Sequence, residues 1–538
     1  MRFLSKLFGL LYLVAAASLP SSIHAQQAGG RVVLVLPFDN RSGNNSLSWI
    51  GDSFPDTLNK RITSAGFLTI SHDDRAFAFD HLGLPADFKP SRATTIRIAQ
   101  QLDANYVIVG SYSVQSTGPV AQPTDRIDVQ AQVLSVDDLR LSPPIQDSAE
   151  LSHLFDAENS IAWKLAKSLD PRFNVALQTF LAAPGTVPLP AFENYIRGSN
   201  APTDAERVQR LKAAIVITPD YAAALLALGK QQYIDRDYTA AAATLAKVPK
   251  GDRVALEANF YLGLARFNNA NYAGAEQAFA FVASRLPLPE VVNDQGVAMS
   301  RQNKDATPLY QKASTADPSD EDYHYNLALA FFRHGDTDAA IRETNAALKL
   351  KPTDNEAVDL RTHLNAVSSG TKLTPNSSGN FAPVERIRRT YSEAGFRQAA
   401  FQLDQMRAVR MALLPPAQQA SEYSQAGRDY LAEGLLPEAE NEFQSALSAD
   451  PNSSEAHTGM AQIREASGNA GQARDEALAS LKLKPNAPAW LVLARLDLAD
   501  NQLAVSASDV SQALHLEPNN PVAIALRMTL AQKGQAVQ

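Results

Sequence analysis

Cysteine and histidine are the side chains that most often mark a metal site or a nucleophile, so their number and spacing are informative. The chain of 538 residues has no cysteine. This excludes disulfides, thiolate metal ligands, cysteine nucleophiles and lipid attachment through cysteine. The histidines beyond residue 25 show neither His-x-x-x-His nor His-Glu-x-x-His spacing; they are His72, His81, His153, His324, His334, His363, His457 and His515. We therefore predict no metal site.

Other patterns that carry chemistry are also missing from the sequence. No Gly-x-Ser-x-Gly motif, which would place a serine nucleophile, stands before a helix. Gly43 and Gly51 are isolated and lack the following Gly-Lys-Ser/Thr of a phosphate loop. Carboxylate pairs such as Asp137-Asp138 fall at turns and helix starts, where they are solvated or act as caps. The sequence thus predicts no enzyme and no cofactor.

A polar loop near the start of the chain is the candidate for a small-molecule site. Its residues Asp39, Asn40, Ser42 and Gly43 follow the apolar stretch 31–38 and precede a helical pattern. Open α/β sheets bind ligands beyond the carboxyl ends of their strands, and a helix N-terminus can receive an anion. A turn followed by a helix cap explains the same residues, and we favour that interpretation.

Residues 1–25 have the order of a secretory signal peptide, with basic residues first, then an apolar stretch, then small residues. The apolar stretch 7–19 is shorter than the roughly 20 residues that a membrane span needs. We expect cleavage after Ala25, with Ala17 as the alternative. The mature protein is then periplasmic or otherwise extracytoplasmic and retains no membrane span, although a membrane-associated partner stays open.

The formal net charge of the chain is −8. A protein that binds the phosphate backbone usually shows a clustered basic face, so we predict no nucleic-acid partner. The length exceeds what one compact core accommodates, so several domains or a repeat array are expected.

Residues 31–171 alternate short apolar stretches with helical patterns, which predicts a small α/β domain. Strands are expected at 31–38, 67–70, 106–109 and 127–136, and helices at 47–62, 95–102 and 154–169. The stretches VLVLPFDNRSG, ANYVIVGSYSV and RIDVQAQVLSVDD, with ELSHLFDAENSIAWKLAKSL, resemble the TolB amino-terminal-like domain. The resemblance implies a periplasmic-type module used in assembly or regulation, with no catalysis to carry over.

The second half of the chain is periodic. Residues 420–451 read as two short helices with a turn at Gly434, and the closing prolines Pro451, Pro485 and Pro518 are 34 and 33 residues apart. Bulky residues alternate with small ones, which lets two helices approach closely. These units, and the stretch 321–354, resemble the tetratricopeptide repeat (TPR).

The predicted architecture is a small α/β domain followed by an all-α TPR solenoid in two blocks. Residues 190–367 form a first array of about five repeats with a cap helix. Residues 368–383 are serine-, glycine- and proline-rich and should be a flexible linker. Residues 384–538 form a second array of three clear repeats with flanking helices.

The start of the second array carries a cluster of basic residues. The stretch 384–414 is predicted to be helical and begins with Arg386, Arg388 and Arg389. A basic surface for an acidic partner and a solvated helix face are the alternatives. We favour the solvated face because Glu385 lies close by.

The resemblance implies a concave groove, lined by the first helix of each repeat, that holds a peptide or helix of a protein partner. The positions that would line it are Asp322, Tyr325, Leu329, Phe332 and Arg333 in one unit and Ser421, Ser424, Arg428, Leu431 and Ala432 in another. Packing between repeats is the alternative role of Leu329 and Phe332. The lysine/asparagine set that clamps a terminal carboxylate is not reproduced, and only Asn326 matches it.

Two functions fit these predictions. The first is a non-enzymatic extracytoplasmic interaction scaffold, in which the α/β module docks one partner and the repeats another. The second is an envelope protein whose α/β domain binds a small molecule or glycan and signals through the repeats. The partner, the oligomeric state and the pathway are not encoded in any recognisable pattern.

Overall fold

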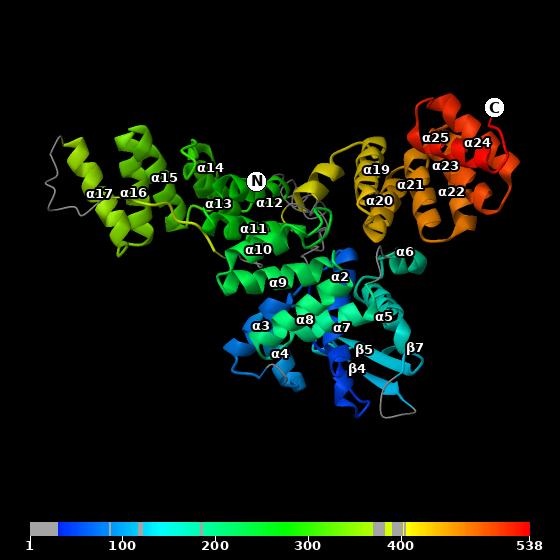
Figure 1. The fold of residues 1–538 in the computed structure, drawn as a ribbon, viewed down its shortest axis with the longest axis horizontal. Helices are drawn as coiled ribbons and strands as arrows, with labels where there is room; N and C mark the ends of the chain where they lie inside the picture. The colour runs from blue at the N-terminus through cyan, green and yellow to red at the C-terminus, as the bar shows by residue number, and fades with distance from the viewer. Residues whose placement is uncertain are drawn as a thin grey trace, which may run out of the picture. The chain divides into compact units, whose positions relative to one another are not determined.

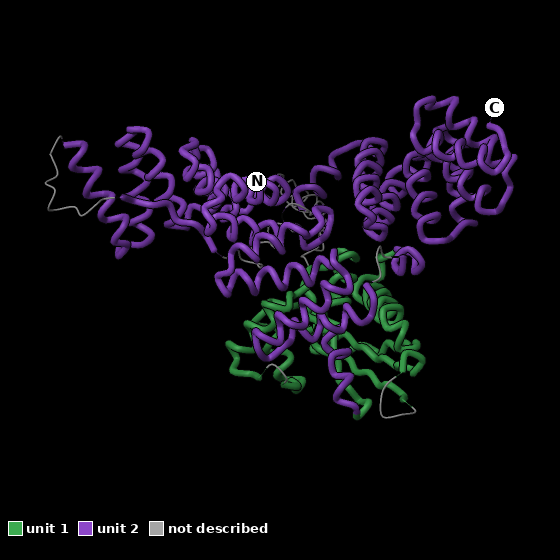
Figure 2. The backbone as a smooth tube through the Cα atoms, viewed as in Figure 1, with its two compact units in different colours: residues 1–43, 54–174 green, residues 44–53, 175–538 purple. Residues whose placement is uncertain are grey.

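The computed structural model describes residues 31–85, 88–116, 122–182, 187–369, 382–389, 402 and 405–537. The chain divides into two compact units, residues 1–43 with 54–174 and residues 44–53 with 175–538 (Figure 2). The predicted signal peptide and most of the predicted linker lie outside the described residues. No helix among the described residues is long and apolar enough to cross a membrane.

The first unit is built on a mixed sheet whose strands lie in the order β3-β1-β4-β5-β6. β1 is parallel to β3 and β4, whereas β5 is antiparallel to β4 and to β7. The strands are β1 (Val32–Val35), β2 (Asp39–Asn40), β3 (Leu68–Thr69), β4 (Tyr106–Gln115), β5 (Arg126–Ser135), β6 (Arg140–Leu141) and β7 (Ile145–Glu150).

Alternation of apolar and polar residues explains the long central pair of strands. Ile127, Val129 and Ala131 on β5 are buried, and the residues between them are polar. β4 pairs with β5 along its whole length, so the strand predicted at 106–109 continues to Gln115. The edge strand β7 was not predicted, because its alternating residues are mostly polar or exposed.

Four helices belong to the α/β part of the chain: α2 (Trp49–Ser64), α3 (His72–His81), α4 (Arg92–Gln101) and α5 (Leu154–Leu169). A core forms where Phe79 of α3 and Ile98 of α4 meet Leu34 and Val107 of the sheet. α5 packs on β5 and β7 and has the bounds that the sequence predicts. α3 was not predicted.

The second unit consists of paired helices (Figure 1). The first array contains α7 (Leu189–Ser199), α8 (Asp204–Ile217), α9 (Ala222–Ile234), α10 (Tyr238–Leu245), α11 (Ala255–Asn268), α12 (Tyr272–Arg285), α13 (Pro289–Ser300), α14 (Thr307–Ala316), α15 (Glu321–His334), α16 (Thr337–Leu350) and α17 (Asn355–Ser368). The second contains α19 (Pro416–Ala432), α20 (Leu436–Ala449), α21 (Ser454–Ala466), α22 (Ala470–Leu483), α23 (Ala487–Ala499), α24 (Leu503–Leu516) and α25 (Pro521–Gln532). The predicted fold class, an α/β domain followed by a helical solenoid, is confirmed.

Close approach of the two helices in a pair depends on a glycine facing a large side chain. A Cβ atom on Gly263 would lie 2.6 Å from the ring of Phe279, and one on Gly427 would lie 2.8 Å from the ring of Phe443. Both phenylalanines are fully buried. The alternation of small and bulky residues in the sequence therefore reflects the close packing of the two helices in each pair.

A short helix, α6 (Leu177–Leu181), packs against α20 and α21. Arg464 on α21 donates to Thr179 at 2.8 Å and forms a two-point ion pair with Glu440 at 2.7 and 2.9 Å. Glu440 also accepts a hydrogen bond from the main-chain nitrogen of Ala176. The Glu440 side chain is fully buried and that of Arg464 nearly so. α6 was not predicted from the sequence.

One helix prediction is wrong. Residues 382–388, which include the first part of the stretch 384–414, have no regular secondary structure, whereas residues 405–412 are helical. Arg386 and Arg388 consequently do not lie on a solvated helix face. Their partners lie in the first array.

Candidate functional site

An extended segment, residues 385–388, lies against the first helices of two successive repeats, α13 and α15. Figure 1 draws it as the uncoiled yellow-green stretch beside them. Asn326 of α15 contacts the main chain of Arg386 twice: its Nδ2 donates to the carbonyl oxygen at 2.8 Å, and its Oδ1 accepts from the N–H at 2.8 Å. Asn293 of α13 donates to the same carbonyl at 3.1 Å. The two asparagine side chains also contact one another at 2.8 Å.

A carboxylate also binds the main chain of this segment. The Oδ1 atom of Asp294 accepts a hydrogen bond from the N–H of Arg388 at 2.8 Å. Asp294 is fully buried, and this burial raises its pKa well above the usual value for an aspartate. The groove therefore holds alternate main-chain groups of a peptide in extended conformation, as a neighbouring strand would.

The Arg386 side chain occupies an aromatic and acidic pocket. Its guanidinium lies 3.8 Å from the ring centre of Tyr325, a cation–π arrangement. It donates to Asp322 at 2.9 Å, to Asp354 at 2.7 and 2.8 Å, and to Glu356 at 2.8 Å. The bond from Arg386 lowers the pKa of Asp354. Two-point contact with Asp354 is the geometry that favours arginine over lysine.

Arg388 lies two residues along and faces the same way as Arg386, as alternation in an extended chain requires. Its guanidinium pairs with Asp320 and lies 3.4 Å from a carboxylate oxygen of Asp322. The ring centre of Tyr323 is 5.6 Å away. Burial raises the pKa of Asp320, although Arg388 opposes that effect.

The intervening side chains, Glu385 and Ile387, contact other parts of the groove. Glu385 is 1% exposed and accepts hydrogen bonds from Ser300 and Arg333, with Arg301 at 3.6 Å. Burial raises the pKa of Glu385, but the bonds from Arg333 and Ser300 outweigh it, so the pKa lies below its usual value. Ile387 packs on the apolar residues beneath the groove.

Comparison with protein families identifies the repeats that build this groove. Models of the tetratricopeptide repeat match residues 300–355 and 430–496, one stretch in each array. Both arrays contain tetratricopeptide repeats. Neither match covers residues 31–171, so the resemblance of that part to the TolB amino-terminal-like domain stays a prediction. A comparison with curated proteins finds no match.

Several solved structures are partly similar to the chain. MamA 41-end from Desulfovibrio magneticus RS-1 is 18% identical, with a TM-score of 0.29 over 32% of this chain and 99% of that solved chain. YrrB, described as a TPR protein with an unusual peptide-binding site, is 14% identical, with a TM-score of 0.28 over 38% of this chain and 97% of YrrB. The LpoB C-terminal domain from Escherichia coli is 22% identical, with a TM-score of 0.18 over 22% and 82%. These TM-scores are low, so no statement about function follows from them.

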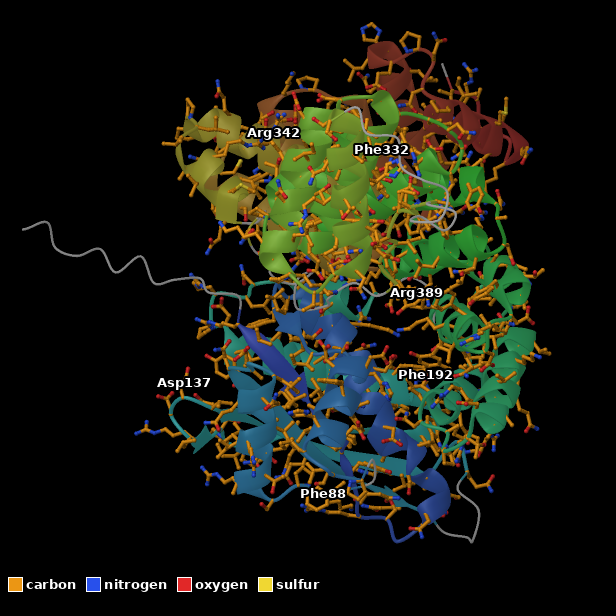
Figure 3. The ribbon with its side chains drawn as sticks, turned by 90° about the vertical axis from the view of Figure 1, so that its left-hand side faces the viewer. Phe88, Asp137, Phe192, Phe332, Arg342 and Arg389 are labelled. Carbon is orange, nitrogen blue, oxygen red and sulfur yellow. The ribbon has the colours of Figure 1, made fainter. Side chains whose placement is uncertain are left out.

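The groove residues predicted in the first TPR array divide into two groups. Asp322, Tyr325 and Arg333 all contact the segment. Leu329 is instead fully buried in the core between α15, α16 and α17, and Phe332 packs on that core with its ring against His363. Figure 3 labels Phe332 and, at the end of the segment, Arg389.

The predicted groove residues of the second TPR array have no peptide segment beside them among the described residues. Ser421 and Ala432 are exposed, Ser424 is buried, and Leu431 packs on the core of its repeat. Arg428 forms an ion pair with Glu455 of the next repeat at 2.8 Å. The two arrays thus present different chemistry at equivalent repeat positions.

The predicted loop residues contact the protein itself. Asp39 and Asn40 form the short strand β2 beside β4, and Asp39 pairs with Lys89 at 3.1 Å. The Ser42 hydroxyl accepts from the N–H of Val114 at 2.8 Å. Gly43 turns the chain at a positive φ of 71°. These contacts match the turn interpretation better than a ligand site.

A shallow depression of about 510 Å³ lies over the polar face of β4, β5 and β7. Three of the charged groups on it are paired within the chain, Arg126 with Asp128 at 2.8 Å and Asp147 with Lys164 at 2.8 Å. Among the described residues no group of three histidine or acidic side chains is placed to hold a metal ion. The groove of the first array is the better-built site.

Several groove residues were not predicted; they are Asn293, Asp294, Ser300, Arg301, Asp320, Tyr323, Asp354 and Glu356. A signal for the first existed, because Asn293 precedes Asn326 by 33 residues, which is close to the repeat period. Asp320, Asp354 and Glu356 lie at helix starts, where a carboxylate is normally read as a cap, whereas Asp294 lies inside α13. Asp354 does both, since it caps α17 and binds Arg386.

Proposed function

We propose that the chain is a non-enzymatic extracytoplasmic interaction scaffold whose first TPR array binds an extended peptide of a protein partner in its groove. The observation that carries the proposal is the pair of hydrogen bonds between Asn326 and the main chain of Arg386. A groove that contacts both the N–H and the C=O of one residue recognises an extended peptide. The TPR repeats in both arrays support the same class of function.

Site-specific photo-crosslinking in cells tests the proposal. A photoreactive residue replaces Arg333, which lies in the groove on α15, or Arg428 in the second array. The matched control replaces the exposed Arg342 on α16, the second helix of the same repeat (Figure 3). We expect discrete protein adducts from the groove position that mass spectrometry identifies. If position 333 yields no adduct beyond those of position 342, the groove of the first array does not bind a partner.

The extracytoplasmic location rests on the composition of residues 1–25. Sequencing the amino terminus of the protein purified from its own host tests it. We expect the mature chain to start at Gln26, or at Ser18 if the alternative cleavage is used. A chain that keeps Met1 and fractionates with the cytoplasm contradicts this part of the proposal.

A further inference from the structure

The groove of the first array gathers four carboxylates around two arginines of residues 385–388. Asp320, Asp322, Asp354 and Glu356 all point their charges at two guanidinium groups of residues 385–388. Buried or half-buried carboxylates without a cation repel one another and lose solvation. The lining therefore fits a cationic occupant, and it disfavours a nucleic acid, whose phosphates would meet these carboxylates.

Positively charged side chains lie beside this acidic part of the groove. Arg301 and Arg333 surround the side chain of Glu385, which is 1% exposed. The groove thus presents two basic groups to Glu385 and four acidic groups to Arg386 and Arg388. A peptide in the reverse direction would place an arginine against Arg301 and Arg333 and its glutamate against Asp320. Charge therefore sets both the composition and the direction of the bound chain.

Between these charged contacts, the asparagines and Asp294 hold the main chain, and Ile387 contributes an apolar side chain. The extended conformation makes the side chains of Arg386 and Arg388 face one way and those of Glu385 and Ile387 the other. The recognised pattern is then Glu-Arg-apolar-Arg, read by two rows of groups on α13, α15 and the start of α17.

We infer, resting on the proposed function, that the partner of this groove carries an extended Glu-Arg-apolar-Arg segment, and that residues 385–388 compete with it. The segment is tethered to the array that binds it, with residues 370–381 between Ser369 and Ala382. A covalent tether of this length gives an effective concentration on the order of millimolar. A partner must therefore displace the chain's own segment, so its apparent affinity is lower than the affinity of the empty groove.

Binding of a fluorescent peptide with the sequence of residues 382–389, APVERIRR, tests the inference. The full chain is compared with the double variant Arg386→Ala/Arg388→Ala, which weakens the tethered segment but leaves every groove residue in place. Arg389→Ala is the matched control, because Arg389 is the exposed arginine of the same cluster. We expect the double variant to bind the probe at least about tenfold tighter than the unaltered chain and Arg389→Ala to match the unaltered chain. Circular dichroism establishes that each variant is folded.

A second variant that releases residues 385–388 tests whether the effect of the first variant is indirect. Glu385→Arg places a cation against Arg301 and Arg333 and should also expel the segment. A probe with both arginines replaced, APVEAIAR, should bind at least about tenfold more weakly to either released chain. Equal binding of the two probes overturns the proposed peptide pattern.

The two proposals fail differently. Equal affinity of the probe for the unaltered chain and both released chains overturns competition by residues 385–388, and leaves the peptide-binding scaffold standing. No binding of the probe to either folded, released chain overturns both the competition and the peptide-binding groove.

Discussion

Asn326 contacts Arg386 through both of the main-chain polar groups that Arg386 possesses, each at 2.8 Å. Because Asn326 is fully buried, its amide has no water to replace these partners. The same amide contacts Asn293, which holds the carbonyl from the other side. Placement of residues 385–388 thus depends on a buried amide more than on any surface charge.

Replacing this amide should release the segment. In Asn326→Ala, Arg386 loses two hydrogen bonds, and Asn293 is left with an unsatisfied polar atom, at a cost of about 1–3 kcal/mol. Hydrogen exchange at the amide of Arg386 should therefore become about tenfold faster or more. Asn365→Ala, on the exposed face of α17, serves as the control. Unchanged protection in Asn326→Ala would show that the arginine pockets alone position the segment.

Two histidines at the same repeat position make the stability of both arrays depend on pH. His324 contacts Glu343 at 2.7 Å and the carbonyl of Pro318 at 3.2 Å; His457 contacts Glu476 and Pro451 at the same distances. The glutamates raise the pKa of each imidazole.

A raised folded-state pKa means that the protonated form is stabilised. This contribution is fully present below the unfolded pKa of about 6.5 and is lost as pH rises through the folded pKa. The double variant His324→Gln/His457→Gln should therefore differ from the unaltered chain in urea midpoint at about pH 5.5 and converge with it at about pH 9. A difference that is constant across this range contradicts the prediction.

Glycine is required where α19 and α21 meet the ring of Phe443. A Cβ atom on Gly459 would lie 2.2 Å from that ring, which α20 holds fully buried. Gly459→Val should destabilise the second array by about 1–3 kcal/mol or more through overpacking, measured by denaturation followed with circular dichroism. Gly471→Ala is the control, since nothing lies within 4 Å of its added Cβ. It should be neutral or stabilise by up to about 1 kcal/mol. Equal effects of the two substitutions would refute the packing argument.

Arg464 forms a buried ion pair with Glu440, and breaking it should be costly. Arg464→Met leaves the carboxylate of Glu440 buried and unpaired, which costs about 3–5 kcal/mol. The pair between Arg495 and Glu465 is more exposed, so Arg495→Met should cost about 1 kcal/mol or less. Hydrogen exchange in α20 and α21 measures both. Adding Glu440→Gln to Arg464→Met should recover part of the loss; no recovery would argue against a charge effect.

The repeats could be predicted because the residues that define each helix pair lie close together in the sequence. The spacing of Pro451, Pro485 and Pro518 reflects one helix pair per unit, and α20, α22 and α24 each end two residues before one of these prolines. The α5 helix was equally predictable from its apolar stripe. Elements stabilised mainly by distant partners were missed, such as β7, which depends on β5, and α6, which depends on α20 and α21.

The segment 384–389 shows the limit of local reasoning. Its arginine and glutamate residues favour helix, and the sequence prediction followed that propensity. Its extended conformation comes from contacts with residues 32 to 94 positions earlier in the chain, such as Asp354 and Asp294. Tertiary contacts override propensity here. Repeat position alone also did not predict the role of Leu329 and Phe332, because the same helix face lines the groove and packs against the next repeat.

The contact of α6 with α21 changes how the second array can unfold. A solenoid whose repeats touch only their neighbours frays one unit at a time from its ends. The bond between Thr179 and Arg464 joins positions 285 residues apart, so it closes a very long loop. Closing that loop costs conformational entropy, and this cost arises late in folding, after α6 and α21 have both formed. The first helices of the second array, α19–α21, should consequently melt as one cooperative block with α6, and this block should be the last to regain its native exchange protection during refolding.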